Sequence, residues 1–314
     1  MAQPALKDAR PVDPVLSSLS LGFKNDRFIW DKVAPPVEVA EQSGTYFIWT
    51  KDFWMRRLNN AMRSPEGPYQ RVGMEVSTST YAALERGFEK VLGDVIVNAT
   101  QIPDLPGAAV EFLTNLIQLE LEKDVAAGAF VTGVWGTTTT LSGSDQWSDF
   151  ANSNPISNAQ TAIRTIKRNT GTKPNRLIVG LLAWEKLADH PLIIERYKHT
   201  QSGIMTEELV AAALGVDELV VGDSVENSAA EGATYVGADI WTDNALFVAT
   251  TETPGRMVAN GAYTFVWNER NNVPWAVERY RDETVRGDVA RVFTHYDVNI
   301  TSSAHGMIFL DTVA

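Results

Sequence analysis

The stretch LPGAAVEFLTNLIQLELEKDVAAGA, residues 105–129, decides the fold that this sequence predicts. Its apolar residues recur at steps of three and four positions and form one stripe along an α-helix: Val110, Leu113, Ile117, Leu121 and Val125. Pro106 suits the first turn of that helix, where a missing backbone N–H costs little. The helix would measure about 36 Å at the usual rise per residue, and we expect it to be the backbone of the protein.

A long hairpin is expected just before this helix. Residues 37–50 and 73–87 are rich in Val, Thr, Tyr, Phe and Trp, which is typical of β-strands. The segment between them includes Pro65, Gly67 and Pro68, and a hairpin tip of that length is uncommon inside a compact domain. We therefore expect this hairpin to project from the body of the protein.

The expected hairpin tip is basic, although the chain as a whole is acidic. The sequence has 27 Lys and Arg against 39 Asp and Glu, a net charge of −12. Residues 51–73 reverse this balance, with a set of basic side chains against Asp52 and Glu66: Lys51, Arg56, Arg57, Arg63 and Arg71. Residues 201–260, in contrast, hold ten acidic residues and one basic residue. The basic tip is therefore a candidate contact surface.

The rest of the chain predicts three further parts. Residues 1–35 are rich in Pro and carry no periodic pattern, so we expect an extended arm. Helices and strands alternate from 156 to 250, which is typical of one α/β unit. The C-terminal part returns to strands, with a clear period of two from Val292 to Ile300.

Composition and motifs exclude several classes of function. Hydrophobic residues make up 44% of the 314-residue chain, and Cys is absent. The first residues have no apolar core of a signal peptide, and no later run approaches the length of a membrane span. We therefore expect a soluble intracellular product. Phosphate-binding, dinucleotide-binding, metalloprotease and serine-hydrolase motifs are absent, and the four His lie far apart. We assign no catalytic residue, no cofactor and no metal ligand, and we interpret His295 and Asp297 as a surface pair.

Several stretches of the sequence carry a family resemblance. They are FIWDKVAPPVEVAEQSGTYFIW (28–49), VEFLTNLIQLELEKDVA (110–126), TGVWG (132–136), QWSDFANSNPISNAQTAIRTIKRNTGTKPNRLIVG (146–180), LADHPLIIERYKHTQSGIMTEELVAAALGVDELVVGDSVENSAAEG (187–232) and AYTFVWNE (262–269). In their number and order these stretches resemble the major capsid proteins of tailed bacteriophages, which have the Hong Kong 97 type of fold. None of them is a catalytic motif.

The resemblance implies an α+β fold of four parts. Residues 1–45 would be an N-terminal arm, 46–82 an extended β-hairpin loop, 83–155 with 262–314 a peripheral domain with the long spine helix, and 156–261 an α/β axial domain. It also implies a structural protein, not an enzyme, whose copies assemble as hexamers and pentamers into an icosahedral shell. That shell would enclose double-stranded DNA without sequence-specific binding and without a membrane. The expected location is the virion, after assembly in the bacterial host cytoplasm.

Further partners follow from the same resemblance. Some family members carry a scaffolding extension before the arm, and this chain starts almost directly at the arm, so we expect a separate scaffolding protein. A portal and, in some shells, a decoration protein would complete the particle. Some members also join neighbours through Lys–Asn bonds. Lys51, Asn59 and Asn60 lie in the loop, but no acidic catalyst can be assigned, so we expect no such cross-link.

We expect the basic loop to dock on an acidic surface of a neighbouring copy, because Arg recognises carboxylates through two parallel hydrogen bonds. The candidate partners lie along the long helix: Glu111, Glu120, Glu122 and Asp124. Three alternatives stay open: an encapsulin-like compartment of the same fold, a soluble α/β enzyme, and a nucleic-acid-binding module. The last would need a basic stripe with aromatic residues, and only residues 51–73 offer a fragment of one.

Overall fold

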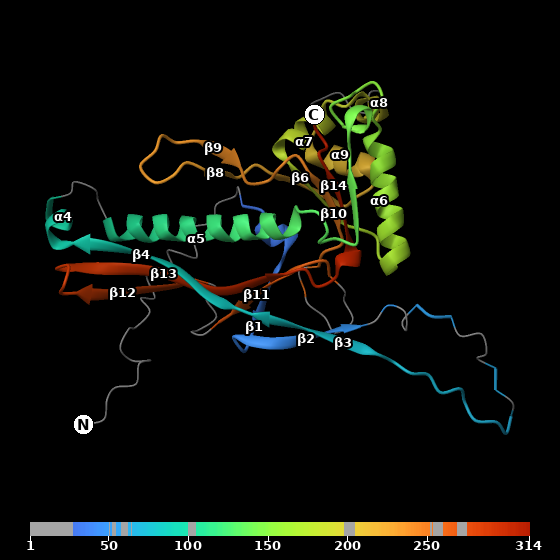
Figure 1. Cartoon of the computed structure of the whole chain (residues 1–314), viewed down its shortest axis with the longest axis horizontal. Helices are drawn as coiled ribbons and strands as arrows, with labels where there is room; N and C mark the ends of the chain where they lie inside the picture. Colours follow the sequence, from blue (N-terminus) through green and yellow to red (C-terminus); the bar gives the residue numbers. More distant parts are fainter. Residues whose placement is uncertain are drawn as a thin grey trace.

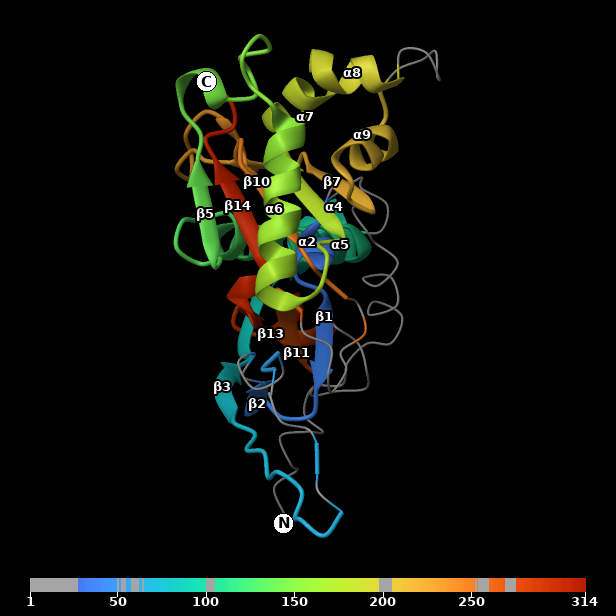
Figure 2. The ribbon, with the colours of Figure 1, turned by 90° about the vertical axis from the view of Figure 1, so that its right-hand side faces the viewer.

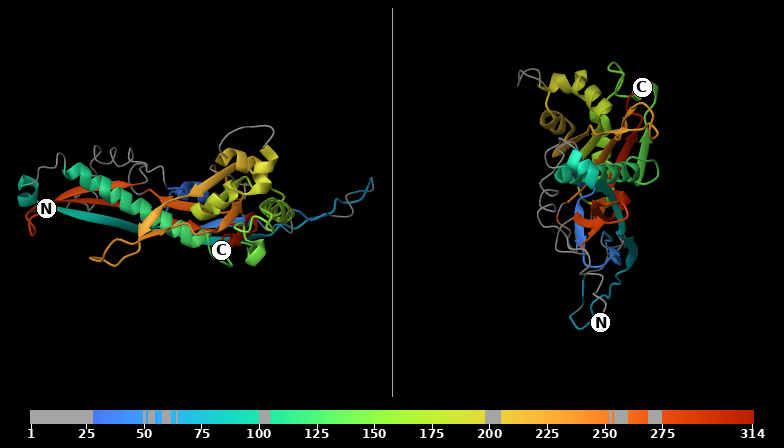
Figure 3. Two further views of the ribbon diagram at one scale, coloured as in Figure 1. Left: turned by 90° about the horizontal axis from the view of Figure 1, so that it is seen from above. Right: turned by 90° about the vertical axis from the view of Figure 1, so that its left-hand side faces the viewer.

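The computed structural model of the chain describes residues 28–49, 51, 55–57, 62–63, 65–99, 105–197, 205–251, 253, 260–268 and 275–314. Figure 1 shows an elongated molecule in which a long helix lies along a sheet, an α/β unit occupies one end and a hairpin projects below. The view from above in Figure 3 shows the same helix running along the body.

The long helix α5, Leu105–Ala129, is the centre of the fold. The apolar stripe predicted from the sequence is buried along its whole length: Val110, Leu113, Ile117, Leu121 and Val125. These side chains share one apolar cluster with Trp241 and Tyr296, which come from segments far away in the sequence. Full burial of such a side chain stabilises the fold by about 1.5–3 kcal/mol, so the helix holds the parts around it together. The predicted spine helix is confirmed.

The first sheet lies against α5 and has five strands. Their order is β1-β11-β13-β12, and β4 also pairs with β13. The strands are β1 Pro36–Val39, β4 Leu84–Gly93, β11 Tyr263–Trp267, β12 Ala276–Asp282 and β13 Gly287–Asn299. β1 runs parallel to β11, and the other pairs are antiparallel. The 13 residues of β13 therefore organise the sheet, because β4 and β12 pair with its first part and β11 with its end.

The second sheet forms the α/β unit, which Figure 2 shows facing the viewer. Its strand order is β5-β14-β10-β6-β7. The strands are β5 Thr137–Thr140, β6 Arg176–Gly180, β7 Glu218–Gly222, β10 Ala245–Val248 and β14 Gly306–Leu310. Four helices share an apolar cluster with this sheet: α6 Pro155–Thr170, α7 Leu181–Ala188, α8 Pro191–Tyr197 and α9 Glu207–Leu214. The alternating elements predicted for this part of the chain are confirmed.

The α/β unit extends beyond the bounds 156–261 that the resemblance implies. β5 and β14 belong to its sheet, although they come from the segments 83–155 and 262–314 that were expected in the peripheral domain. β5 has the sequence TTTT, and Thr favours strands, but nothing local shows which sheet this strand joins. Its pairing with β14 joins residues more than 160 positions apart in the chain, which no local pattern can reveal.

The predicted strands around the hairpin are each divided. Residues 37–50 contain the end of β1 and all of β2, Ser43–Trp49, because the chain leaves the first sheet there and enters the hairpin. Residues 73–87 contain β3, Val76–Ala82, and the start of β4, with only Ala83 between them. β2 and β3 pair over seven positions as a two-stranded sheet. The extended hairpin is therefore present, and it is a direct continuation of β4.

The remaining elements are short. They are α2 Trp30–Val33, α4 Asp94–Ala99, β8 Val225–Asn227, β9 Gly237–Asp239 and the 3₁₀ turns Gly143–Asp145 and Ser303–His305. α2 and β1 belong to the predicted arm, yet Val33 is fully buried and β1 is a strand of the first sheet. The last part of the arm is therefore integrated into the core.

Candidate assembly surface

The base of the extended hairpin is fixed to the first sheet. The backbone N–H of Ala82 donates to Oδ2 of Asp297 on β13 at 2.9 Å. Tyr81 stacks on Phe265 of β11 with ring centroids 4.8 Å apart, and Tyr46 lies 5.3 Å from the same ring. The far part of the hairpin extends away from the body, as Figure 2 shows. The hairpin is therefore anchored at its base and projects from the body at its far part.

The basic residues predicted for the hairpin tip are all exposed: Lys51, Arg56, Arg57, Arg63 and Arg71. Among the residues that the structure describes, none of the five forms an ion pair. Arg63 has a local role, because it donates to the backbone oxygen of Pro65 at 3.0 Å and lies over the Tyr69 ring at 4.6 Å. The other four cations are available to a partner. Asn59 and Asn60, for which no cross-link is expected, lie outside the described residues.

The tip also exposes large apolar side chains, which the sequence analysis missed. Met62 is 91% exposed and Tyr69 is 76% exposed, and they belong to a larger set along the hairpin: Phe47, Met55, Met62, Tyr69, Val72 and Met74. Exposed apolar groups of this kind mark interaction surfaces, and Met adapts well to irregular partners. The signal was present in the sequence as Met and aromatic residues in a segment without a core pattern.

The four predicted acidic partners on α5 fall into different environments. Glu111 and Glu120 are exposed. Asp124 is half-buried and already bound within the chain, where it pairs with Arg86 of β4 and accepts a hydrogen bond from the Tyr296 hydroxyl at 2.9 Å. Glu120 and Glu111 therefore remain open to a neighbour, whereas Asp124 is committed to β4 and β13.

Glu122 is not a surface residue, so its prediction as a docking partner is wrong. Its side chain is fully buried and accepts hydrogen bonds from the backbone N–H of Trp30 at 2.8 Å and from Nε1 of Trp241 at 2.6 Å. The N–H of Ile29 and the hydroxyl of Ser224 also donate to it, each at 3.0 Å. Burial raises the pKa of Glu122, and these four donors oppose the rise.

Glu122 joins three separate segments of the chain to each other. The donors are Trp30 in α2, Ser224 just before β8, and Trp241 just after β9. The reason for its burial is visible only in the fold. Thr114, Gln118 and Glu122 follow one another at four-residue spacing beside the apolar stripe, and all three are buried. Ile29 and Trp30, in the described end of the arm, contact Glu122, and a helical pattern alone cannot show that contact.

A hollow of about 370 Å³ lies between β4 and α5, close to Glu120. It is lined by Glu85, Arg86, Gly87, Phe88, Ile117, Glu120 and Tyr296. Glu85 and Glu120 are exposed carboxylates, and Phe88 is a partly exposed apolar group beside them. This combination suits a side chain that carries both a positive charge and an apolar stem.

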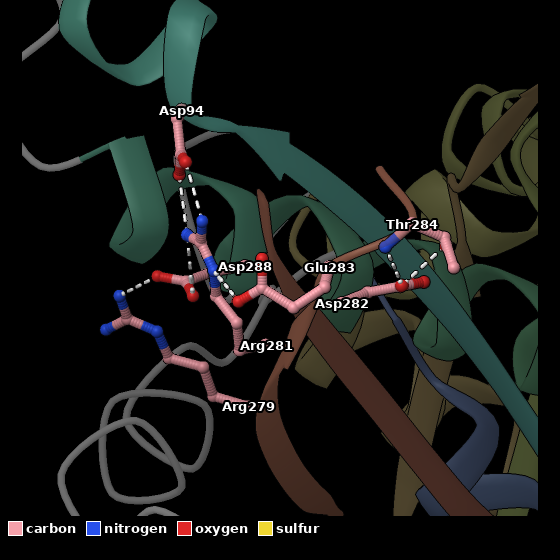
Figure 4. A network of polar contacts seen from close by, with 7 residues as sticks. All are labelled: Asp94, Arg279, Arg281, Asp282, Glu283, Thr284 and Asp288. Carbon is pink, nitrogen blue, oxygen red and sulfur yellow. Dashed lines mark hydrogen bonds and ion pairs between the residues drawn. The ribbon is translucent and has the colours of Figure 1, made fainter. Parts of the chain in front are cut away.

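The far end of the first sheet carries charged residues that are satisfied within the chain, as Figure 4 shows. Arg281 on β12 donates from both Nη atoms to the two carboxylate oxygens of Asp94, each at 2.6 Å. Arg279 donates to Asp288 at 2.6 Å. In the turn between β12 and β13, the N–H of Thr284 donates to Oδ1 of Asp282 at 2.8 Å. These contacts tie α4, β12 and β13 together.

The titratable side chains do not form a catalytic arrangement in the described residues. His190 Nε2 lies 3.1 Å from the hydroxyl of Ser153, but Nδ1 of His190 accepts from the N–H of Leu192. The proton therefore sits on Nε2, and the ring cannot act as a base toward Ser153. His295 and Asp297 are not a pair either: His295 is buried beside Trp267, and Asp297 holds the hairpin base.

The described part of the chain lacks two further kinds of feature. It contains no group of three or more His, Asp or Glu residues placed to hold a metal ion. None of its helices is both long enough and apolar enough to span a membrane.

Curated proteins with similar sequences share one description. The chain is 29% identical over 241 residues to the major capsid protein of Burkholderia phage BcepMu, a match that covers 76% of each chain. It is 28% identical over 249 residues to the major capsid protein of Pseudomonas phage JBD67, covering 76% of this chain and 77% of the relative. This chain is a relative of phage major capsid proteins. No protein-family model matches it.

Solved structures share the capsid fold with this chain. A phage-related protein from Bordetella bronchiseptica RB50 matches 97% of this chain and 99% of its own, with a TM-score of 0.76 at 22% identity. The capsid of cyanophage P-SCSP1u matches 90% of this chain and 88% of its own, with a TM-score of 0.60 at 11% identity. A virus-like particle from Pyrococcus furiosus matches 94% and 95%, with a TM-score of 0.52 at 12% identity. The α+β capsid fold expected from the sequence is confirmed.

Proposed function

We propose that this chain is the structural subunit of a phage head shell, assembled as hexamers and pentamers around double-stranded DNA. The observation that carries the proposal is the extended hairpin, whose tip exposes apolar side chains together with basic side chains that form no ion pair among the described residues. Exposed apolar side chains beside basic ones are typical of a surface that contacts another molecule. The relationship to phage major capsid proteins supports a neighbouring copy as that partner.

The tip of the hairpin docks beside the spine helix of the neighbouring subunit. Glu111 and Glu120 are the exposed carboxylates on α5, and the hollow beside Glu120 adds Glu85 and the Phe88 ring. Arg56 and Arg57 supply the complementary charges, while the exposed Met side chains of the tip supply apolar contact. Each exposed ion pair contributes about 0–1 kcal/mol, so docking depends on many repeated copies and on the apolar contacts.

A complete particle needs further components. The proposal includes a separate scaffolding protein, a portal and, in some shells, a decoration protein, with assembly in the bacterial host cytoplasm and a final location in the virion. The subunit acts without catalysis, cofactor or membrane. The excess of acidic residues supports a wall that encloses DNA without holding it strongly, since strong binding to a phosphate backbone requires clustered cations.

The test replaces the two arginines of the tip. Arg56→Glu with Arg57→Glu should leave the subunit folded, as measured by circular dichroism, and should strongly reduce the yield of particles in electron micrographs. Arg56→Lys with Arg57→Lys keeps both charges and should assemble nearly as the wild type does. A wild-type yield of particles from the Glu variant would refute the docking role of these residues.

The contents of the particle separate this function from an encapsulin-like compartment. Similarity to a virus-like particle shows that related folds form other shells, although the curated relatives are phage proteins. Particles purified from infected cells should contain double-stranded DNA that resists nuclease until the shell is opened. A shell that contains a protein cargo and no DNA would support the compartment instead.

A further inference from the structure

A set of basic side chains lies at one end of the α/β unit. It consists of Arg164, Lys167 and Arg168 on the last turns of α6 and Lys173 in the turn that follows. All four are exposed, and none is ion-paired within the part of the chain that the structure describes. Positions three and four residues apart on a helix share one side, so the three helical cations form a continuous patch, here called the basic end.

A set of acidic side chains lies at another place in the same unit. It consists of Glu207 and Glu208 in the first turn of α9 and Asp223 just after β7, here called the acidic end. All three are exposed, and within the described residues none has a cationic partner. Burial and the nearby charge of Asp223 raise the pKa of Glu207, so these two carboxylates lie close enough to interact.

Other acidic residues of the unit differ in this respect. Glu218 pairs with Arg176 at 2.7 Å and Glu226 pairs with Lys123 at 2.7 Å. The acidic run seen in the sequence therefore separates into residues satisfied within the subunit and residues left for a partner.

The two sets lie at opposite ends of the parallel pair β6 and β7. A turn of residues 171–175 connects α6 to β6, so α6 runs back along the sheet and its C-terminal end lies at the start of β6. A turn of residues 215–217 connects α9 to β7 in the same way, so the first turn of α9 lies near the end of β7, where Asp223 follows. Strands of five residues separate the two ends by about 16 Å. Figure 2 shows α6 descending in front of the sheet, with α9 beside it.

We propose that the basic end of one subunit docks on the acidic end of the next subunit within a ring. The inference rests on the proposed function, since it names the charge contact that joins neighbouring α/β units in a capsomer. A second copy is the occupant that the charges favour, because each copy presents one patch of each sign at different places. Such a head-to-tail contact is heterologous, and it closes into a ring when each copy uses both of its patches.

These charges also have a local effect that must be measured separately. Lys167 and Arg168 lie at the C-terminal end of α6, and Glu207 and Glu208 lie at the N-terminal end of α9, where their signs complement the helix dipoles. That effect changes the stability of the isolated subunit. Docking changes assembly, so the melting temperature of the subunit and the yield of rings report on different roles.

The experiment exchanges the charges of one end at a time. The first variant carries Arg164→Glu, Lys167→Glu and Arg168→Glu, and the second carries Glu207→Lys, Glu208→Lys and Asp223→Lys. Each alone should give a folded subunit and about tenfold fewer capsomers and particles than the wild type, because every contact in the ring would join like charges. A third variant with all six substitutions restores opposite charges at every contact and should recover assembly.

A mixture of the first two variants gives a sharper result. In a ring where the two variants alternate, every contact again joins opposite charges, so hexamers should form. Pentamers should not, because alternation fails in a ring with an odd number of members. Native mass spectrometry or micrographs of isolated capsomers would distinguish the two ring sizes.

The inference is overturned if either single-end variant assembles like the wild type. It is also overturned if the variant with all six substitutions folds but does not recover assembly. Equal recovery of hexamers and pentamers from the mixture would also contradict it. Assembly of the variants could also depend on added DNA and not on whether the contacts join opposite charges. That result would assign the basic end to DNA binding and overturn the proposal. Failure of the wild-type chain to form any ring or shell would instead refute the proposed function.

Discussion

The far end of the first sheet and the tip of the extended hairpin carry similar charged residues but use them differently. At the far end, Arg281 and Arg279 are paired with Asp94 and Asp288, so their charges stabilise the subunit itself (Figure 4). At the tip, Arg56 and Arg57 have no ion pair within the described residues and stand beside exposed apolar side chains. The two regions therefore differ in whether their charges have partners within the described chain. Those of the far end stabilise the subunit, and we propose that those of the tip contact a neighbouring copy.

The largest expected effect comes from a charge that is fully satisfied within the subunit. Glu122→Ala removes the acceptor of four buried hydrogen bonds and leaves their donors unpaired. We expect a loss of at least about 1–3 kcal/mol in the free energy of unfolding, the cost of leaving a buried hydrogen-bond donor unsatisfied. Chemical denaturation of the subunit measures this loss. Glu111→Ala, on the exposed side of the same helix, is the matched control and should change stability by less than about 0.5 kcal/mol.

The opposite result is expected for the apolar side chains of the tip. Met62→Ser with Met74→Ser removes exposed groups, so the free energy of unfolding of the subunit should stay within about 0.5 kcal/mol of the wild type. Particle yield should fall, because the neighbour loses apolar contact. A fall in subunit stability without a fall in particle yield would show that these Met side chains stabilise the subunit and do not contact a neighbour.

A smaller and pH-dependent effect is expected at Glu218, which lies between the arm and the α/β unit. Burial works to raise the pKa of Glu218, but Arg176 and Lys32 outweigh it and lower that pKa. A lowered pKa in the folded state stabilises the fold above the unfolded pKa, and the stabilisation is lost as the pH falls through the folded pKa. Glu218→Gln should therefore cost less than about 1 kcal/mol at pH 7.

The pH profile tests the sign of this assignment. The difference in unfolding free energy between the wild type and Glu218→Gln should disappear below the folded pKa of Glu218. A difference that grows as the solution becomes more acidic would contradict the ion pair with Arg176.

The smallest expected effect is at the exposed ion pair of the far end. Arg281→Ala should lower the melting temperature of the subunit slightly and leave particle yield unchanged, because the Arg281 pair with Asp94 is internal and exposed to solvent. A normal melting temperature with loss of particles would place the far end among the assembly contacts and remove the contrast with the hairpin.

Local patterns predicted the elements that depend on neighbouring residues. The stripe from Val110 to Val125 predicted α5, and the period of two from Val292 to Ile300 predicted the later part of β13. The parts that could not be predicted are non-local. Burial of Glu122 depends on the arm that covers it, and the place of β5 depends on β14, which is near the other end of the chain.

The assembly surface, too, has one part that the sequence predicted and another that it did not. The basic character of residues 51–73 was visible in the sequence, and the structure places these side chains in solvent. The acidic partners were chosen from one helix without knowledge of its covered side, so Glu122 was included wrongly and Asp124 was already bound to Arg86. The apolar residues of the tip were overlooked, because exposure is a property of the fold and not of residue type.

The single residue between β3 and β4 gives the hairpin the mechanics of a lever. Ala83 is fully buried, and the N–H of the preceding residue Ala82 donates to Oδ2 of Asp297 on β13 at 2.9 Å, so the hairpin cannot swing freely where it leaves the sheet. A paired length of seven residues extends about 23 Å. A tilt of the subunit by about 5° would move the end of this paired length by about 2 Å, enough to break or remake a hydrogen bond. A small change of angle between flat and curved parts of a shell would therefore change the contacts between the hairpin and a neighbouring subunit.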